Sequence, residues 1–462
     1  MTNTTDAGNG ALPVMPPCDH QPRPYDGPSR EEVLEMRREF LTPALLTYYR
    51  EPIMIVEGHM QWLFDHTGRR YLDGLAGIVT VSVGHCHPKV VAAINEQNER
   101  LQHATTIYLH PNIAEFGKKL ASTFPKDSGL GVHYFTNSGS EANELAMLMS
   151  RMHTGNHDII ALRNAYHGMT NEAMGLCGLH TWKQNYASGF GIKHAKFPDC
   201  FRGPHGYDDP DAGEKYAEEI HDLIRYGTSG SVAAFIAEPI QGVGGTRDLP
   251  AGFLPKVYEM VRAAGGLCIS DEVQTGFGRT GTAFWGFENH GVTPDIVTMA
   301  KGIGNGAPLA CCTTRSEITD AMTASIHFNT YGGNAVSMAA GLATLDVILE
   351  EKIQQRALEI GNHLREGLDE LHGRHPMLGD VRGRGLMLGL EIVTDRTSNA
   401  PATEATGAIF ERCRELGLLV GKGGLEGNVI RLKPPMCWTR KDVEFACEVF
   451  DRALSEVEAD GA

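Results

Sequence analysis

Short apolar runs alternate with amphipathic segments through the middle of the chain, from about Gly84 to Pro308. The apolar runs are HYFTNSG, DIIALRN, VAAFIAEP, GLCISDEV and DIVTMAKG, and each is typical of a strand. The run that ends at Lys301 is apolar enough to be buried on both faces. Segments between them, such as EANELAMLMSRM and FLPKVYEMVRAAGG, repeat apolar residues with helical spacing. This alternation predicts a mostly parallel sheet with helices on both faces.

The two flanking regions follow other patterns. The chain before about Pro28 is rich in Pro, Gly and Asp, so we expect an irregular arm there. Ser29 and Glu32 form the pattern of a capping box and predict that a helix begins beside them. Gly68 lies between two stretches of mixed apolar and aromatic residues, which predicts a hairpin. After YGGN the pattern predicts one long helical stretch, followed by strand, helix and strand.

These patterns predict three parts of the chain. Residues 1–83 form an N-terminal arm, helix and hairpin that belong to a small domain. Residues 84–333 form the large domain with the parallel sheet. Residues 334–462 form the C-terminal part, a second and smaller α/β domain.

Composition narrows the class of protein. The chain has 462 residues, of which 42% are hydrophobic, and a formal net charge of -16, which argues against nucleic acid as a partner. No apolar run reaches the roughly 18 residues of a membrane span. The first residues lack the features of a signal or transit peptide, so we expect a cytoplasmic protein without a membrane partner.

Cysteine and histidine do not form a recognisable metal motif. The ten cysteines include no C-x-x-C pair, so reduced thiols are expected. His85, Cys86 and His87 are adjacent, and three adjacent side chains do not easily converge on one tetrahedral ion. We therefore predict no metal site, and a tight turn with Pro88 at the start of the next helix.

Three chemically active side chains follow apolar runs. Glu238, Asp271 and Lys301 each come at the carboxyl end of a predicted strand. A parallel sheet gathers such ends along one edge, where open α/β sheets bind their ligands. Each acid alone is most often a solvated strand end or a helix cap. Two acids and a lysine together point to a site.

An anion site is predicted next to them. Gly139 and Ser140 lie in the first turn of a predicted helix that follows a strand, and the free N–H groups of such a turn attract phosphate. Simple N-capping explains the same residues. The glycines after Lys301 lack the G-x-G-x-x-G spacing of a dinucleotide site. A lysine, an acid and a phosphate site at one sheet edge suit pyridoxal phosphate (PLP).

Motifs along nearly the whole chain, from about Pro16 to about Ala453, carry a resemblance. NSGSEAN, YHG, AEPIQG, DEVQTGFGRTG, TMAKGIGNG, FNTYGGN and RLKPP occur in the order typical of class III aminotransferases of fold type I, and the sequence resembles that family. The resemblance implies a PLP-dependent aminotransferase with a mostly parallel sheet in a large domain. It also implies a smaller α/β domain built from both chain ends, and a homodimer with shared active sites.

A subgroup resemblance suggests substrates. MPPCDHQP, GHMQWLFD, GIVTVSVGHCHPKV and GLLVGKGG resemble the alanine–glyoxylate aminotransferases of the second type. These enzymes use glyoxylate or pyruvate as amino acceptor, and some act on 3-aminoisobutyrate. Animal members carry a mitochondrial presequence that this sequence does not show.

The resemblance also implies roles for residues around the cofactor ring. Lys301 would bind the cofactor aldehyde and later move a proton at the substrate, and Asp271 would pair with the pyridine nitrogen. Gln274 would donate to the phenolic oxygen. Tyr166 would stack on the ring, with His167 beside it.

Further roles concern the phosphate and the substrate. Gly139 and Ser140 would bind the phosphate, and Thr330 would reach the phosphate of the neighbouring subunit. Arg431 would bind the substrate carboxylate, since a guanidinium offers a bidentate grip. Glu238 has two family roles, ordering the cofactor pocket or covering the arginine, and the sequence does not choose between them.

The sequence is also compatible with other functions. An aminomutase, a decarboxylase or an omega-amine:pyruvate aminotransferase could use the same fold and cofactor. A catalytically inactive binding protein is a further alternative, which intact Lys301 and Asp271 disfavour.

Overall fold

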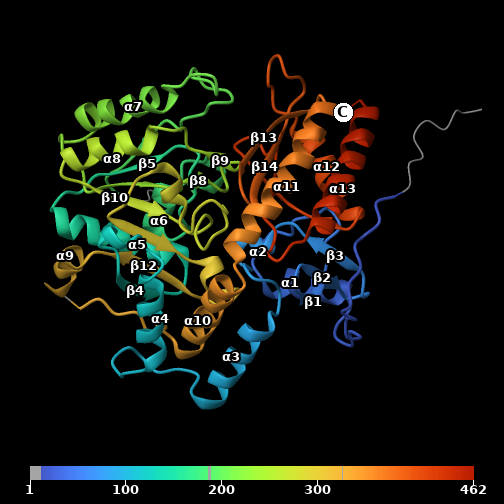
Figure 1. Ribbon diagram of the computed structural model, residues 1–462, viewed down its shortest axis with the longest axis horizontal. Coiled ribbons are helices and arrows are strands. Elements are labelled where there is room, and N and C mark those ends of the chain that lie inside the picture. The colour runs from blue at the N-terminus through green and yellow to red at the C-terminus, as the bar shows by residue number, and fades with distance from the viewer. Residues whose placement is uncertain (1–11, 186–188, 325, 462) are drawn as a thin grey trace, which may run out of the picture.

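The computed structural model describes residues 12–185, 189–324 and 326–461 (Figure 1). Its largest sheet has seven strands in the order β4 (Val132–Thr136), β12 (Ala310–Thr314), β11 (Ile296–Met299), β10 (Leu267–Asp271), β7 (Ala234–Ala237), β5 (Ile159–Leu162) and β6 (Ile192–Ala195). β12 is antiparallel to both of its neighbours, and the pairs from β11 to β6 are parallel. The predicted mostly parallel sheet is confirmed, with β6 and β12 as additional strands.

Alternating side chains of this sheet face two different layers of helices. Ile159 and Ile236 pack in a cluster with residues of α5 (Gly139–Thr154). Ile160 and Phe235, one residue away on the same strands, pack with α7 (Ala212–Gly227) and α8 (Phe253–Ala263). Because side chains alternate along a strand, α5 covers one face of the sheet and α7 and α8 cover the other (Figure 1).

Shorter elements complete this part of the chain. They are α3 (Pro88–Arg100), α4 (Pro111–Ala121), α6 (Asn171–Leu176), α9 (Ser316–Thr319), β8 (Ile240–Gln241), β9 (Arg247–Asp248) and the 3-10 turns η1 (Lys126–Ser128), η2 (His180–Trp182), η3 (Gly286–His290) and η5 (Asp320–Ala324).

Two further sheets are formed by strands from the N-terminal and C-terminal parts of the chain. One has the order β1 (Ile55–His59), β2 (Trp62–Asp65), β3 (Arg70–Asp73) and β15 (Leu418–Leu419), and β15 pairs in parallel with β3. The other has the order β13 (Leu378–Arg384), β14 (Met387–Ile392), β17 (Val429–Leu432) and β16 (Gly421–Gly423). The pairing of β3 with β15 joins the N-terminal hairpin to the C-terminal region.

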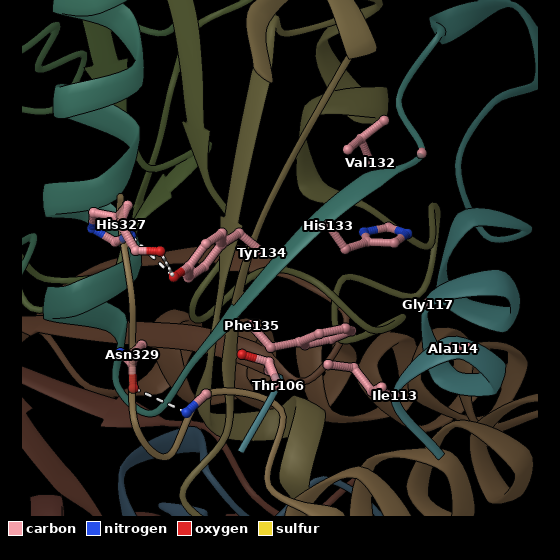
Figure 2. A pocket seen from close by; sticks show the side chains of 12 residues that line it. Thr106, Ile113, Ala114, Gly117, Val132, His133, Tyr134, Phe135, His327 and Asn329 are labelled. Atoms are coloured by element: carbon pink, nitrogen blue, oxygen red, sulfur yellow. Dashed lines mark hydrogen bonds between the residues drawn. The ribbon is translucent and has the colours of Figure 1, made fainter. Parts of the chain in front are cut away.

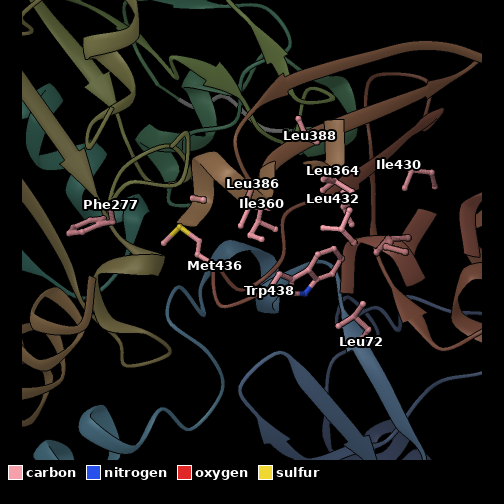
Figure 3. Close-up of a cluster of buried hydrophobic side chains, with 14 of the residues drawn as sticks. Leu72, Phe277, Ile360, Leu364, Leu386, Leu388, Ile430, Leu432, Met436 and Trp438 are labelled. Carbon is pink, nitrogen blue, oxygen red and sulfur yellow. The ribbon is translucent and has the colours of Figure 1, made fainter. Parts of the chain in front are cut away.

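A hydrophobic core joins the same two regions. Leu72 of β3 belongs to one cluster with Leu364, Leu388, Leu432 and Trp438, all of which lie in the C-terminal part of the chain (Figure 3). The helices of these regions are α1 (Arg30–Phe40), α2 (Ala76–Val79), α10 (Ala335–Glu350), α11 (Ile353–Arg374), α12 (Thr403–Glu415) and α13 (Arg440–Ala459). The division into residues 1–83, 84–333 and 334–462 stays a prediction.

Several local predictions hold. Ser29 and Glu32 form the capping box at the start of α1, Gly68 has a φ of 81° in the turn between β2 and β3, and Pro88 is the first residue of α3. The predicted long helical stretch is confirmed, and it consists of two helices, α10 and α11. Lys352 between them has a φ of 54°, a left-handed conformation that cannot continue a right-handed helix.

No helix in the described part of the chain is long and apolar enough to cross a membrane. No group of three or more His, Cys, Asp or Glu residues in it could hold a metal ion. His85 instead pairs with Asp73, at 2.7 Å between Nε2 and Oδ2.

A buried carboxylate on β14, that of Glu391, connects this strand to arginine residues of other segments. Glu391 has no solvent exposure and accepts hydrogen bonds from Arg202 and Arg247, at 2.9 Å from Arg247 Nη2. It also forms an ion pair with Arg382, at 2.5 Å from Nη1. Asn428 donates a further bond of 3.2 Å to the same carboxylate. Arg247 lies in β9 and Arg382 in β13, so one buried charge fastens three segments together.

We expect Glu391→Gln to destabilise the fold strongly. The amide leaves three guanidinium groups near each other without their shared anion, and breaking a buried pair costs about 3–5 kcal/mol. The unfolding midpoint in urea measures the change. Asp369→Asn is the matched control, because Asp369 pairs with Arg365 on the exposed surface of α11 and such pairs contribute about 0–1 kcal/mol. Equal midpoints for the two variants would contradict a structural role for Glu391.

Candidate active site

The carboxyl ends of the parallel strands open into one cavity of about 340 Å³. Lys301 follows β11, Asp271 ends β10, Glu238 follows β7 and Tyr166 follows β5. The cavity contains every predicted site residue except Thr330, namely Gly139, Ser140, Tyr166, His167, Glu238, Asp271, Gln274, Lys301 and Arg431. The structure therefore brings together residues that are almost three hundred positions apart. For Glu238, Asp271 and Lys301, their place at one edge of the sheet agrees with the strand-end argument.

Lys301 opens the 3-10 turn η4 (Lys301–Gly304) and has a φ of 51°. Left-handed backbone is unfavourable for a lysine, and such strain is found mostly at functional sites. Burial lowers the pKa of Lys301, while the charges of Asp271 and Glu238 raise it and do not compensate fully. Because of the lowered pKa, a larger fraction of the Lys301 amine is in the uncharged, nucleophilic form than in an ordinary lysine.

Asp271 is held by three donors. Its Oδ2 lies 2.7 Å from Nδ1 of His167 and accepts from Nδ2 of Asn143 at 2.9 Å, and its Oδ1 accepts from the backbone N–H of Val273 at 3.1 Å. Asn143 in turn accepts from the Thr298 hydroxyl at 2.6 Å, which fixes the orientation of its amide. These bonds hold a buried carboxylate in one place.

Sequence reasoning missed Asn143. Asn143 is 1% exposed and lies on α5 among residues that pack onto the sheet. A polar residue on the apolar face of a helix was the available signal, because a buried amide must find hydrogen-bond partners.

Tyr166 and His167 form the wall beside Asp271. The ring of Tyr166 meets that of Trp182 edge to face, with centroids 4.9 Å apart, and Trp182 also lines the cavity without having been predicted. Burial raises the pKa of Tyr166. His167 is 2% exposed, and its Nε2 has no hydrogen-bond partner in the part of the chain that the structure describes.

Both carboxylate oxygens of Glu238 accept hydrogen bonds from backbone N–H groups. Its Oε1 accepts from Tyr166 at 3.2 Å and its Oε2 accepts from Gly242 at 2.7 Å. Burial raises the pKa of Glu238, and His167 opposes the change. These contacts favour the first of its two predicted roles, ordering the pocket.

The first turn of α5 contains the residues of the predicted anion site. Ser138 caps the helix by accepting from the N–H of Glu141 at 3.3 Å, and α5 begins at Gly139. The N–H groups of a first turn have no acceptor within the helix, so those of Gly139 and Ser140 are available to a phosphate. A Cβ on Gly139 would come within 3.2 Å of the Val273 side chain, which leaves little room for a larger residue.

Arg431 reaches the cavity from β17 in the second region of the chain. It is 7% exposed, and within the described ranges its Nε and Nη1 have no hydrogen-bond partner. A Cβ on Gly423 would lie 2.8 Å from Nε, so the neighbouring strand packs tightly against the guanidinium. A buried cation with unused donors is costly unless it receives an anion.

Thr330 lies elsewhere on the chain. It is exposed, in the segment before α10, and does not line the cavity of Lys301. Its neighbour Asn329 lines another cavity, of about 440 Å³, along the edge strand β4 (Figure 2). Within one chain, Thr330 does not join the other predicted residues.

Proteins of known function resemble this chain over most of its length. Alanine–glyoxylate aminotransferase 2 homolog 2, mitochondrial, from Arabidopsis thaliana is 52% identical over 443 residues, which cover 96% of this chain and 91% of that protein. Alanine–glyoxylate aminotransferase 2, mitochondrial, from Homo sapiens is 45% identical over 475 residues, which cover 98% and 92%.

These names correct one expectation. The predicted cytoplasmic location is wrong, because the relatives are mitochondrial proteins. The prediction rested on features that the first residues lack, and such an absence does not decide a location.

Solved structures agree with the fold and the cofactor. A phospholyase from Arthrobacter in complex with phosphoethanolamine has a TM-score of 0.85 at 34% identity, covering 92% of this chain and 99% of that one. An amine transaminase from an uncultivated Pseudomonas species in its PLP-bound form has a TM-score of 0.85 at 30% identity, covering 90% and 98%.

The family assignment rests on the whole chain. The model of the class III aminotransferases matches residues 47–454. The nucleophilic lysine, the buried aspartate and the first turn of α5 all fit PLP. The chain belongs to the class III aminotransferases and is a PLP-dependent aminotransferase of fold type I.

Proposed function

We propose that this enzyme transfers an amino group from alanine, or from a β-amino acid such as 3-aminoisobutyrate, to glyoxylate or pyruvate. The names of the relatives from Arabidopsis and human support the pair alanine and glyoxylate. The observation that carries the proposal is Arg431, a buried guanidinium with two unpartnered nitrogen atoms in the same cavity as Lys301. Each proposed substrate has one carboxylate for it to bind.

Two residues would act on the reacting atoms. When bound, PLP carries the amino group between the two substrates and delocalises the electron pair of the substrate's C–H bond. Lys301 would bind the cofactor aldehyde and, once released by the incoming amine, would move a proton at the substrate carbon, for which its lowered pKa is suited. Asp271, fixed by His167 and Asn143, would keep a proton on the pyridine nitrogen.

The remaining cavity residues would bind and orient. Gln274 would donate to the phenolic oxygen, and Gly139 and Ser140 would bind the phosphate through the first turn of α5. Tyr166 would stack on the ring, with His167 beside it. Glu238 would order the backbone of the pocket through its two bonds to N–H groups.

Arg431 would hold both substrates in turn. Donor and acceptor share a carboxylate and little else, so one guanidinium can place each at the same distance from Lys301. The tight packing of Gly423 against Arg431 supports a fixed orientation of the guanidinium. A fixed orientation favours bidentate binding of a carboxylate.

The proposal includes a homodimer. Exposed apolar side chains gather in two segments, and large exposed apolar patches mark interfaces. The first contains Ile107, Tyr108 and Leu109, and the second contains Ile326, Phe328 and Tyr331. Thr330, within the second segment, would then bind the phosphate of the partner's site. The small domain would comprise residues 1–83 and 334–462.

We expect the purified PLP-bound protein to form glycine from glyoxylate and pyruvate from alanine in equal amounts. Equal formation follows from a reaction in which one amino group is exchanged, and chromatography of both products measures it. A panel with pyruvate, 3-aminoisobutyrate and amines without a carboxylate separates the proposed substrates from an omega-amine:pyruvate aminotransferase. Release of CO₂, of an isomerised amino acid, or of phosphate from phosphoethanolamine without transamination would contradict the proposal.

We expect Arg431→Ala to lower kcat/KM for alanine, glyoxylate and pyruvate together by roughly two to three powers of ten. Removing one partner of a buried charged pair costs about 3–5 kcal/mol, and 1.36 kcal/mol corresponds to tenfold. Steady-state kinetics with each substrate measure the loss.

A simple amine without a carboxylate is the matched control, because it has nothing for Arg431 to bind and should lose much less. Arg431→Lys keeps the charge and should recover only part of the activity, since an ammonium cannot bind in a bidentate manner. Equal losses for all donors would mean that Arg431 supports the fold instead.

A further inference from the structure

Lys433 is a second lysine next to the cavity, and neither the fold nor the proposed reaction has used it. It lies two residues after Arg431 in the RLKPP motif and has no solvent exposure. Its Nζ donates to the backbone oxygen of Gly242 at 3.1 Å and to Oε1 of Gln274 at 3.0 Å. A fully buried amine with two oxygen partners has a defined position, because a buried donor must be satisfied.

This contact decides which end of the Gln274 amide faces the cavity. The two ends of a glutamine amide are nearly alike in shape, and their assignment follows from their hydrogen-bond partners. A lysine ammonium is a donor only, so the oxygen of Gln274 faces Lys433. Burial and the charge of Arg431 lower the pKa of Lys433. The uncharged amine still has two N–H groups, one for each of the two oxygens.

The backbone beside Gln274 limits its other positions. A Cβ on Gly242 would lie 2.2 Å from Nε2 of Gln274, so the glycine packs directly against the amide. The N–H of Gly242 donates to Glu238 at 2.7 Å, which fixes this peptide segment. Lys433 is fixed as well, since its own N–H donates to the oxygen of Gly74 at 2.7 Å.

We propose that Lys433 is a positioning residue that holds the Gln274 amide with its NH₂ group toward the cavity. Gln274 is 5% exposed and lines the cavity, so this NH₂ group is the donor that it offers to a ligand. The inference rests on the proposed function, in which Gln274 donates to the phenolic oxygen of PLP. Lys433 acts through Gln274 and touches neither substrate nor cofactor.

The test is a pH titration of the absorption band of the PLP-bound protein, with variants at both positions. Gln274→Leu removes the donor and should move the titration midpoint to higher pH by about half to one pH unit, the effect of one hydrogen bond. Lys433→Met should move the midpoint in the same direction. The double variant should match Gln274→Leu, because the two residues act through one bond.

Two further variants separate positioning from stability. Arg279→Met removes another buried cation, which donates to the oxygens of Leu386 and Pro434 and has no hydrogen bond to Gln274 among the described residues, and it should lower the unfolding midpoint without moving the titration. Gly242→Ala leaves Lys433 in place but pushes the amide away, so it should move the titration as Gln274→Leu does. Lys433→Gln provides the test if Lys433→Met does not fold, because it keeps a polar side chain in the buried site, while an amide can also accept and so no longer fixes which end of Gln274 faces the cavity.

The outcomes distinguish the inference from the function on which it rests. An unchanged midpoint in the folded Lys433 variant beside a shifted one in Gln274→Leu would overturn the role of Lys433 alone. Shifts that add in the double variant would do the same. An unchanged midpoint in Gln274→Leu would overturn the proposed contact of Gln274 with the cofactor, and the positioning role with it.

Discussion

The parallel register of three neighbouring strands is the constraint on which the site depends. Ile269 of β10 pairs with Ile236 of β7 and with Ile296 of β11, so the three strands run level with one another. Asp271 is consequently level with Glu238, and Lys301 comes just beyond the same edge. Hydrogen bonds between strands set this alignment, and side chains far apart in sequence meet without any need for loops to place them.

Several side chains at this edge of the sheet lack the hydrogen-bond partners that such groups usually have. Lys301 has a lowered pKa, and Arg431 and His167 keep buried nitrogen atoms without partners in the described residues. The first turn of α5 adds free N–H groups. Burial of such groups is unfavourable on its own, and it persists because Glu391 and the shared core hold the two regions of the chain around the cavity. An aldehyde would bind to Lys301, and a phosphate would accept hydrogen bonds from the first turn of α5. The carboxylate of a substrate would pair with Arg431.

The sequence was informative for site residues whose place in the fold depends on their position along a strand or helix. Glu238, Asp271 and Lys301 were predictable as strand ends, and Gly139 as a first helical turn, because both depend on local patterns. The antiparallel β12 was not predictable, since direction in a sheet depends on the connections. Asn143 and Lys433 act through contacts with residues more than a hundred positions away, and no local pattern contains such contacts. Thr330 was predicted from the family and does not reach the cavity of its own chain.

The central claim is that this sheet edge holds PLP on Lys301. Two lysines lie near the cavity, Lys301 on its wall and the fully buried Lys433 behind Gln274, so the claim can be tested by asking which one reacts. The PLP-bound protein is reduced with borohydride, digested and mapped by mass spectrometry. The account predicts that the cofactor is attached to Lys301 alone. Attachment to Lys433, or to any other lysine, would contradict it.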